Sequence, residues 1–405
     1  MPAPERRTWG DLTAAAVLAV AVLVVAGTLW WTSDIRHTTS ITATGPAPAE
    51  QAPDAVRLPS ALRELWRAAS PAAPVPLAKD GIAVTAAGGE VAGRDIGSGA
   101  IRWSYQRDLP LCTVGAAFDR VVALYQRGET CSETTTLQWA DGRRGAQRTG
   151  PVEAPTRLAG DSDQAATTGR RYLEVWRSDL VRTLAYGRLP SPAEPATEPR
   201  PNCIHGSLAL SSERLAVVEH CPDERSARLT VQRSRPKEPE QPEVDFSTLV
   251  PGAQARVVAL STDRVAVAVP GPPRLLVYDA RGDVVGTYPL AVPDTDLRGD
   301  PPGGQVAITR TPTGFYWFTG SATVALDVDD LQPRWTHPGS LGPGSMFAGR
   351  LLLPVPGALR VLDPITGQEL QTLPVNRGGY RGPVGTATDG SVVLEQRGGT
   401  LVALG

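Results

Sequence analysis

Three aspartates in one loop have the spacing that calcium chemistry uses. Asp294, Asp296 and Asp300 lie in the stretch PDTDLRGDPPGG, and alternate aspartates are ligands that Ca²⁺ accepts. The glycine and the glutamate that an EF-hand loop needs at fixed positions are missing. We therefore interpret the loop as a solvated turn, with calcium as the alternative.

A second stretch combines cysteine with histidine. Cys203 and His205 are two residues apart, and His220 and Cys221 are adjacent. In strands, residues two apart share a face whereas neighbours point to opposite faces. Tetrahedral zinc coordination by these four side chains is therefore awkward. Zinc is the alternative, and disulfides are the favoured interpretation.

The four cysteines are spaced as two pairs, Cys112 with Cys131 and Cys203 with Cys221. Each bond would close a loop of about twenty residues and contribute roughly 3 kcal/mol by constraining the unfolded chain. Such bonds form in oxidising compartments outside the cytoplasm.

Enzymatic motifs are missing from the sequence. It contains no G-x-S-x-G, H-E-x-x-H or Walker loop. Only four histidines occur, and we expect surface or turn roles for His37 and His337. We therefore expect no catalytic, cofactor-binding or metal-ligating residue and no cofactor.

An apolar segment near the N-terminus predicts a membrane anchor. Residues 12–31 carry no charge and, as a helix, match the thickness of a bilayer core. Arg6 and Arg7 precede the segment and favour a cytoplasmic N-terminus. A cleaved signal peptide is the alternative, but the run is long and its Trp30-Trp31 end is a poor cleavage site.

The anchor sets the expected organisation of the chain. Residues 1–11 form a short cytoplasmic segment, and 12–31 form the transmembrane helix. Residues 32–60, rich in Pro, Ala and Thr, form a tether, and 61–405 form one domain outside the cytoplasmic membrane. A net charge of −2 and only two lysines give no signal for nucleic-acid binding.

A short unit recurs through this domain. Residues 91–103, VAGRDIGSGAIRW, read as a strand, a tight turn and a second strand. Asp95 can accept hydrogen bonds from turn amides, and Gly99 can take a positive φ angle. Simple alternation would place Ile101 and Trp103 on one face of the second strand.

Degenerate copies follow at a spacing of roughly 36 to 54 residues, which is typical of propeller blades. Clear or fair copies carry the turn and packing residues Asp279, Asp327, Trp335, Asp363 and Gly367. Short runs of Val, Leu and Ala precede the turns and suit strands that are buried on both faces.

The two ends of the domain are complementary. Its last strand, around Leu401, lacks a following tryptophan strand, and a matching strand with Trp66 opens the domain. Pairing these two strands would close a ring. The fold class is therefore all-β, an eight-bladed β-propeller of four-stranded blades behind one transmembrane helix, with seven blades as the alternative.

Three loops stand out as candidate recognition elements. They are the Asp294 loop and two Pro- and Glu-rich stretches, residues 190–201 and 235–242. We expect the two stretches to be extended or poorly ordered. We also expect all three loops on one face, at connections between the outer strand of one blade and the inner strand of the next.

The Asp-x-x-Thr/Ser-Gly turn with a nearby Trp resembles the repeat of pyrroloquinoline-quinone-type (quinoprotein-like) β-propellers. Asp95, Asp363 and the Trp residues match the structural motif of that family, which includes dehydrogenases and non-enzymatic envelope proteins. The enzymatic branch carries adjacent cysteines, and this sequence has no Cys-Cys pair. The layout also resembles uncharacterised envelope proteins of actinobacteria.

These observations predict a non-enzymatic scaffold or binding module. It is attached to the membrane by one helix, and its partner is an envelope or membrane protein. One alternative is a quinone-dependent dehydrogenase. Another is a propeller that binds envelope glycans, which needs an exposed line of aromatic side chains such as Tyr316, Trp317 and Tyr380.

Overall fold

The computed structural model describes residues 8–31, 34–45, 58–190 and 198–405. Helix α1 (Trp9–Trp31) begins three residues before the uncharged run. The Thr8 hydroxyl accepts a hydrogen bond from the Asp11 amide, and the Asp11 carboxylate accepts one from the Thr8 amide, which together cap the helix. In the described residues, α1 is the one helix long and apolar enough to cross a membrane.

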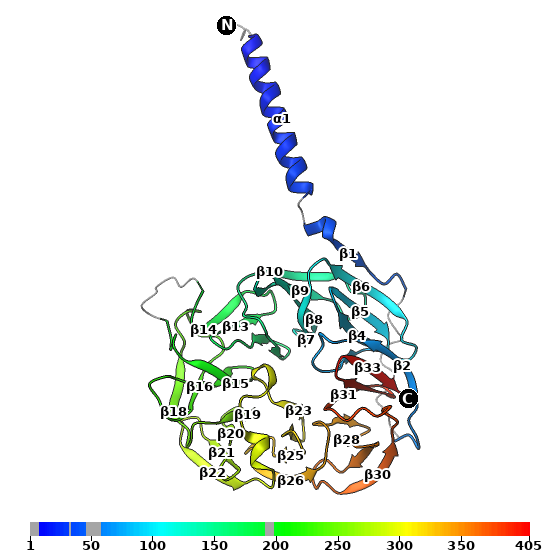
Figure 1. Ribbon diagram of the computed structural model, residues 1–405, viewed down its shortest axis with the longest axis vertical. Helices are drawn as coiled ribbons and strands as arrows, with labels where there is room; N and C mark the ends of the chain where they lie inside the picture. Colours follow the sequence, from blue (N-terminus) through cyan, green and yellow to red (C-terminus); the bar gives the residue numbers. More distant parts are fainter. Residues whose placement is uncertain (1–7, 32–33, 46–57, 191–197) are drawn as a thin grey trace.

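In the part of the chain that the structure describes, thirty-three strands form eight sheets arranged as a ring (Figure 1). From the centre outward, the first four blades consist of β3 (Leu77–Lys79), β4 (Ile82–Ala87), β5 (Glu90–Asp95) and β6 (Ile101–Arg107); β7 (Leu111–Ala117), β8 (Arg120–Arg127), β9 (Thr130–Leu137) and β10 (Arg144–Thr149); β11 (Leu158–Gly160), β12 (Gln164–Thr167), β13 (Tyr172–Arg177) and β14 (Arg182–Gly187); and β15 (Ile204–Leu210), β16 (Arg214–His220), β17 (Arg228–Arg233) and β18 (Val244–Leu249).

The remaining four blades consist of β19 (Arg256–Leu260), β20 (Val265–Val269), β21 (Arg274–Tyr278) and β22 (Val284–Pro289); β23 (Ala307–Thr311), β24 (Gly314–Phe318), β25 (Ala322–Leu326) and β26 (Pro333–Pro338); β27 (Ser345–Phe347), β28 (Arg350–Val355), β29 (Ala358–Leu362) and β30 (Glu369–Pro374); and β31 (Val384–Asp389), β32 (Val392–Arg397), β33 (Thr400–Leu404) and β2 (Glu64–Ala69). The prediction of eight four-stranded blades is confirmed, and the seven-bladed alternative is wrong.

The eighth blade contains the ring closure. Its outer strand β2 comes from the N-terminal side of the domain and pairs antiparallel with β33. Trp66 lies opposite Ala403 and Ala68 lies opposite Leu401, while Trp66 and Leu401 belong to one apolar cluster. No sheet edge is left open at the junction, as the complementary ends predicted.

Part of the expected tether is folded onto the ring. Residues 38–41 form β1 (Thr38–Ile41), which pairs antiparallel with β6 as a fifth strand of the first blade. A short 3₁₀ turn, η1 (Asp34–His37), precedes it, and the Ala43 amide donates to the Asp141 carbonyl in the second blade. Polar Thr and Ser residues hid this strand, because an edge strand satisfies its backbone without burying an apolar face.

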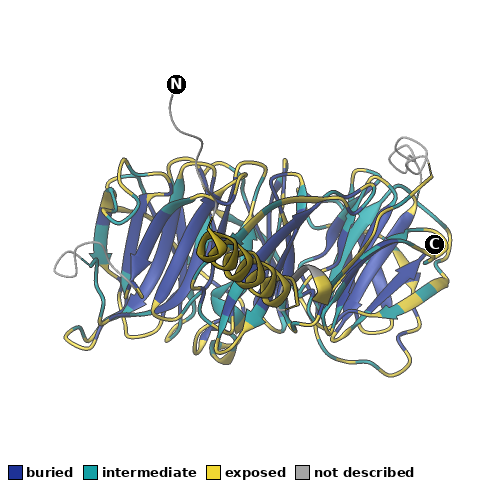
Figure 2. Ribbon diagram, turned by 90° about the horizontal axis from the view of Figure 1, so that it is seen from above, coloured by how far each residue is buried: buried dark blue, intermediate teal, exposed yellow. Residues whose placement is uncertain are grey.

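The core lies between the blades. The second and third strands of the blades are largely buried, and β20 is buried at each of its five residues. Figure 2 shows buried strands running through the thickness of the disc and exposed turns on its two faces. The near-continuous Val, Leu and Ala runs of the sequence are therefore central strands of stacked sheets.

Each of the eight outer strands shifts register near its start, by a β-bulge. In the first blade, Arg94 lies opposite Ile101 and Gly93 lies opposite Trp103. The expectation that Ile101 and Trp103 share a face is wrong, since Ile101 is 52% exposed and Trp103 is fully buried. A bulge interrupts alternation and redirects the side chain that follows it.

The two faces of the ring carry different connections. The turn face carries the turns between the third and outer strands, and the connection face carries the links from one blade to the next. The Asp294 loop is on the connection face, but residues 235–242 join β17 to β18 and so lie on the turn face. The expected clustering of all three loops is therefore wrong; residues 191–197 of the third loop lie outside the described residues.

The segment 235–242 is also more ordered than its composition suggested. The Pro239 carbonyl accepts a hydrogen bond of 2.7 Å from the Ala185 amide in the third blade. Glu240 binds the Arg182 guanidinium of that blade at 2.6 Å. Contacts to the neighbouring blade compensate for the missing apolar residues, and these contacts are not visible in the local sequence.

Candidate functional site

The aspartates of the repeat motif close turns. The Asp95 carboxylate accepts hydrogen bonds from the Ser98 amide and hydroxyl at 2.9 and 2.8 Å. The Asp363 carboxylate accepts bonds from the amides of Ile365 and Thr366 at 3.0 and 2.9 Å. The amide of Thr366 is the main cause of the lowered pKa of Asp363. Asp279 and Asp327 bind amides of their own turns in the same way, so these residues have structural partners.

Tryptophans of the motif join neighbouring blades. Trp66 packs on Gly99 of the first blade, Trp103 on Gly142 of the second, and Trp335 on Gly367 of the seventh. An added Cβ at these glycines would lie 2.6–2.7 Å from the indole ring. Each indole N–H donates to a backbone carbonyl of the same turn, those of Ile96, Trp139 and Pro364. We call this arrangement the aromatic lock.

The sequence placed the glycine and the tryptophan in one repeat but did not show that they meet across an interface. The glycine of each lock has a positive φ, between 70° and 74°, which an L-residue adopts only with strain. In the fifth blade, Gly282 takes the same role under Phe246 of the fourth blade. The motif residues therefore hold the ring together, in agreement with their expected role in turns and packing.

Four buried glutamates, which the sequence analysis did not single out, lie between blades near the connection face: Glu133, Glu174, Glu219 and Glu395. Each interrupts an otherwise apolar or hydroxyl-rich strand, and that interruption is the signal that could have identified them. A buried carboxylate needs ionic or hydrogen-bonding partners. The partners across each interface come from the blade that precedes the glutamate's own blade, or from the segment that connects these two blades.

The Glu395 site is the most enclosed of the four. Arg377 binds both carboxylate oxygens at 2.9 and 2.7 Å and also donates to the carbonyls of Val355 and Ala358 in the seventh blade. Arg397 donates to the same carboxylate at 2.7 Å. The three charged side chains are 6% exposed or less. This triad fastens the eighth blade to the seventh.

Glu174 and Glu219 also bind side chains of the preceding blade. Arg148 of the second blade binds Glu174 of the third through both oxygens, at 3.1 and 2.9 Å. Tyr186 of the third blade donates to Glu219 of the fourth at 2.9 Å. Burial raises the pKa of Glu219, and its hydrogen bonds and Arg200 oppose the shift. An elevated carboxyl pKa is a common property of catalytic acids, but here the group is covered by structural partners.

The aspartates suggested as calcium ligands point to three different blades. Asp294 accepts a bond of 2.6 Å from the Gly271 amide in the fifth blade. Asp296 accepts a bond of 3.0 Å from the Ser321 amide in the sixth. Asp300 lies 3.1 Å from His220 in the fourth. The described residues contain no group of three metal-ligating side chains, so calcium finds no cluster at this loop.

The loop that carries these aspartates, residues 290–306, is a strap across the connection face. It contains the short turns η3 (Asp294–Leu297) and η4 (Pro302–Gly304), and Figure 1 shows it reaching toward β15 near the centre of the ring. Gly303 lies against Arg157 of the third blade, and burial lowers the pKa of that arginine. The strap therefore contacts four consecutive blades, the third to the sixth, and is not a simple solvated turn.

Both predicted disulfides are present, Cys112–Cys131 and Cys203–Cys221, and the zinc alternative is wrong because both sulfurs of its site are bonded to each other. Each bond starts at or just before an inner strand on the connection face; Cys131 lies at the start of the third strand β9, and Cys221 lies directly after the second strand β16.

His205, next to one of these bonds, is buried. Its Nδ1 lies 3.0 Å from the Gly169 carbonyl, its ring stacks on Tyr186, and burial lowers its pKa to about 4.

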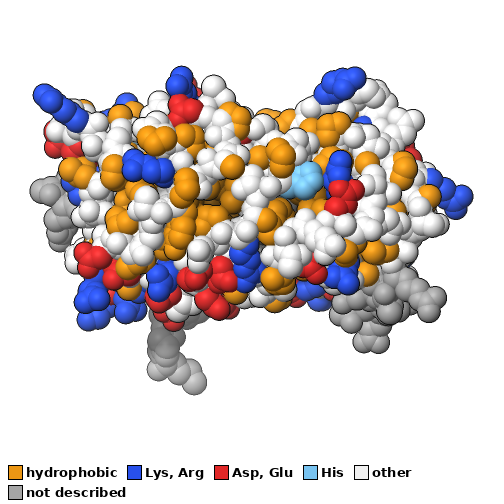
Figure 3. Space-filling model, turned by 90° about the horizontal axis from the view of Figure 1, so that it is seen from below, with side chains coloured by type: hydrophobic (Ala, Val, Ile, Leu, Met, Phe, Trp, Pro, Cys, Tyr) orange, Lys and Arg blue, Asp and Glu red, His pale blue; other side chains and the backbone are white. Residues whose placement is uncertain are grey.

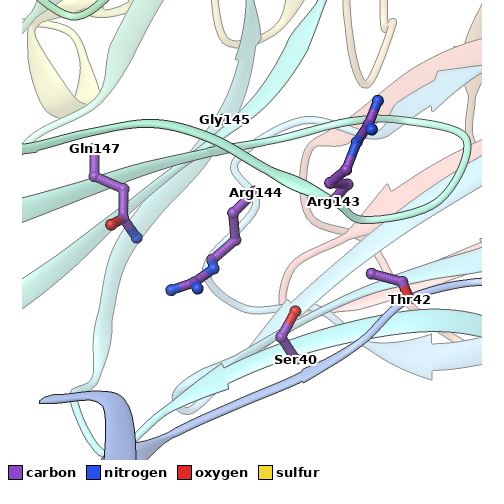
Figure 4. A pocket seen from close by; sticks show the side chains of 6 residues that line it. All are labelled: Ser40, Thr42, Arg143, Arg144, Gly145 and Gln147. Carbon is purple, nitrogen blue, oxygen red and sulfur yellow. The ribbon is translucent and has the colours of Figure 1, made fainter.

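A pocket of about 410 Å³ lies on the rim where β1 faces β10 (Figure 4). Its lining is polar and cationic: Ser40, Thr42, Arg143, Arg144, Gly145 and Gln147. Figure 4 shows the Arg144 and Gln147 side chains extending from β10 to one side of the strand, whereas the Arg143 side chain extends to the other side. The sequence analysis missed this site because β1 was taken as tether.

The fold and these sites define an eight-bladed β-propeller behind an apolar helix. No protein-family model matches the sequence, and no curated protein matches it either. Among solved structures, the computationally designed Ika8 protein superposes with a TM-score of 0.54 at 13% identity, over 83% of this chain and 96% of that one. The likeness shows the fold alone.

Proposed function

We propose that this chain is a non-enzymatic binding module of the cell envelope, held at the cytoplasmic membrane by α1 with its N-terminus inside and the propeller outside. The apolar helix and the two disulfides support this placement. The partner is an envelope or membrane protein that adds an extended segment to the outer edge of a blade. The repeats are those of a quinoprotein-type propeller, as in actinobacterial envelope proteins, which the turns of Asp95 and Asp363 support.

The pairing of β1 with β6 is the observation that carries this proposal. Four consecutive residues of β1 pair with the outer strand of the first blade. The chain itself therefore uses the edge of a blade as a template for an added strand, which is a recurrent mode of peptide recognition. In the described residues, the outer strands of the other seven blades have no fifth strand beside them.

We place the partner at the fifth blade, which lies across the ring from the blade that β1 joins and whose outer strand exposes two consecutive valines. Val284 and Val285 of its outer strand β22 are 50% and 48% exposed, and Leu370 of β30 is 45% exposed. Figure 3 shows apolar side chains gathered over the rim that carries these strands. Exposed apolar residues beside unpaired backbone groups favour strand addition.

The residues that could do chemistry have structural partners instead. The buried glutamates bind arginine or tyrosine across blade interfaces, and the strap aspartates bind neighbouring turns. Tyr316 and Trp317, two of the aromatics that a glycan site would need on the surface, are fully buried. These contacts favour binding over catalysis and give no support to the dehydrogenase or the glycan alternative.

Photo-crosslinking in intact cells tests the proposal. A photo-reactive amino acid replaces Thr287, an exposed residue of β22, in the full chain. We expect one reproducible protein adduct, and we expect the Val285→Lys change in the same chain to abolish it, because a lysine on an edge strand opposes strand addition. Crosslinked peptides should place an extended partner segment beside β22.

Val181, which is 46% exposed on the third blade, provides the matched control. The Val181→Lys change should leave the adduct at position 287 unchanged. Equal loss with both lysine variants, or an adduct whose partner segment does not lie along β22, would overturn the assignment of this edge. Efficient labelling without any protein adduct would overturn the proposed function.

A further inference from the structure

The outer strand of the second blade, like the other seven, carries a β-bulge near its start. In β10, Arg144 lies opposite Leu137 and Gln147 lies opposite Thr135, so three steps on one strand match two on the other. Residues three apart normally point to opposite faces, but the bulge between them turns both toward the same side. Arg144 and Gln147 therefore reach into one space (Figure 4).

The other wall of this space is β1. Ser40 belongs to β1, and Thr42 follows directly after its end. Both residues line the pocket with Arg144 and Gln147. The floor at Gly145 is tight, since an added Cβ would lie 2.6 Å from the Thr136 hydroxyl. Arg144, Gln147, Ser40 and Thr42 thus line one pocket from two segments that are distant in sequence.

The charge in this pocket is unbalanced. No carboxylate lines it, and no ion pair of Arg144 occurs in the described residues. Arg182, at the same place in the third blade, is neutralised by Glu240 at 2.6 Å. Arg143 at the margin pairs with Asp141 at 4.0 Å. One free guanidinium with neutral donors matches an oxyanion that carries a single negative charge.

The pocket is also close to the helix end. Ser40 follows Trp31 by nine residues, and a fully extended chain of that length spans at most about 32 Å. Any bilayer that α1 crosses therefore brings lipid headgroups into the neighbourhood of the pocket.

We propose that this pocket binds a phosphodiester group. Arg144 donates to the phosphate oxygens in bidentate fashion, and Gln147, Ser40 and Thr42 donate the remaining hydrogen bonds. The phosphodiester belongs either to an anionic phospholipid headgroup or to a soluble glycerophosphodiester. The site lies on the rim across the ring from the proposed partner edge, so either inference can fail without the other.

Two arms of one experiment distinguish the sources, with the full chain in maltoside micelles. In the first arm, glycerophosphoglycerol is titrated and binding is followed by isothermal calorimetry. In the second arm, phosphatidylglycerol is added and retained lipid is counted by native mass spectrometry. The variants are Arg144→Gln, Gln147→Leu and, as the matched loss of one charge on the fifth blade, Arg281→Gln, whose side chain is 84% exposed.

We expect Arg144→Gln to weaken binding by about tenfold or more in the arm that binds, because it removes the charge-assisted pair. Gln147→Leu should weaken binding less, and Arg281→Gln should bind as the unchanged chain does. Binding in the lipid arm alone assigns the headgroup, whereas binding of the soluble diester alone assigns the free compound. Equal binding by Arg144→Gln and Arg281→Gln, or no binding by the unchanged chain in either arm, would overturn the site.

Discussion

Replacement of His205 by phenylalanine tests how far burial controls ionisation in this ring. The imidazole is buried, stacks on Tyr186 with ring centroids 5.5 Å apart, and lies with Nδ1 3.0 Å from the Gly169 carbonyl. Its Nε2 is buried without a hydrogen-bond partner among the described residues. A neutral ring fits this site, whereas a charged ring would have no counter-ion.

The expected magnitude comes from the shift of the pKa from 6.5 to about 4. The folded pKa is the lower one, so the unfolded chain binds more protons and stability falls as the pH falls through this window. Linkage gives a loss of about 2 kcal/mol of unfolding free energy between pH 8 and pH 5 from this residue alone. The phenylalanine variant does not titrate and should not suffer this loss.

Urea unfolding of the full chain in micelles, followed by tryptophan fluorescence between pH 8 and pH 5, measures the effect. At pH 8, His205→Phe should be the less stable protein, since the Gly169 carbonyl loses its donor. The difference in unfolding free energy should then move by about 2 kcal/mol in favour of the variant as the pH reaches 5. Burial raises the pKa of Glu219 in the folded state, which gives a pH dependence of the opposite sign, but both proteins share it. Parallel pH profiles of the two proteins would refute the reasoning.

Two further predictions concern the contacts between blades, with unfolding free energy as the measurement. Gly142→Ala should destabilise the ring by about 2–4 kcal/mol, since φ is +71° and the added Cβ would lie 2.6 Å from the Trp103 ring. The control Gly357→Ala has φ +74° but open space around the added Cβ, so it should cost only about 1 kcal/mol. Equal losses of unfolding free energy in the two variants would contradict the aromatic lock. Glu395→Leu should cost about 3–5 kcal/mol of unfolding free energy, because it leaves buried arginines unpaired. The control Glu369→Leu removes one partner of a more exposed ion pair and should cost under about 1 kcal/mol. A small effect of Glu395→Leu would contradict the role of the triad.

The architecture was accessible from the sequence because it depends on repeated short-range signals. Turns such as that of Asp95 close on their own amides, and strands such as β20 are apolar throughout. Complementary ends then predicted that the strand of Trp66 would pair with the last strand. Each of these inferences needs only local chemistry and the rule that a sheet must hide its edges.

The contacts between blades were not accessible in the same way. Trp103 and Gly99 stand in one repeat, yet Trp103 packs on Gly142 of the next blade. The bulge that directs Trp103 there is a register shift, which alternation rules do not contain. The strand β1 was missed for a related reason, because the backbone pairing of Thr38 and its neighbours with β6 leaves no apolar pattern in the sequence.

The candidate sites were less predictable than the fold because they join segments that are distant in sequence. The pocket needs Ser40 from the membrane-proximal strand and Arg144 from the second blade. The strap aspartates could be found as a motif, but their partners on three blades could not. A motif identifies which groups are present, whereas their roles depend on which neighbours the fold provides.

The distribution of contacts between blades explains the position of the strap in the ring. Aromatic locks join the eighth blade to the first, the first to the second, the fourth to the fifth and the sixth to the seventh. Buried glutamates join the first to the second, the second to the third, the third to the fourth and the seventh to the eighth. Among the described residues, the contact between the fifth and sixth blades has neither device.

At that interface the strap provides the connection. Asp296 binds the turn of Ser321, and Leu297 is buried in the apolar cluster shared by the two blades. A closed ring opens first at its weakest contact, so a link at this place stabilises every other interface. The acidic strap therefore stabilises the contact between the fifth and sixth blades. Its aspartates are engaged by neighbouring turns, whereas Arg144 on the rim has no ion pair in the described residues, which is why we propose Arg144 and not the strap for ligand binding.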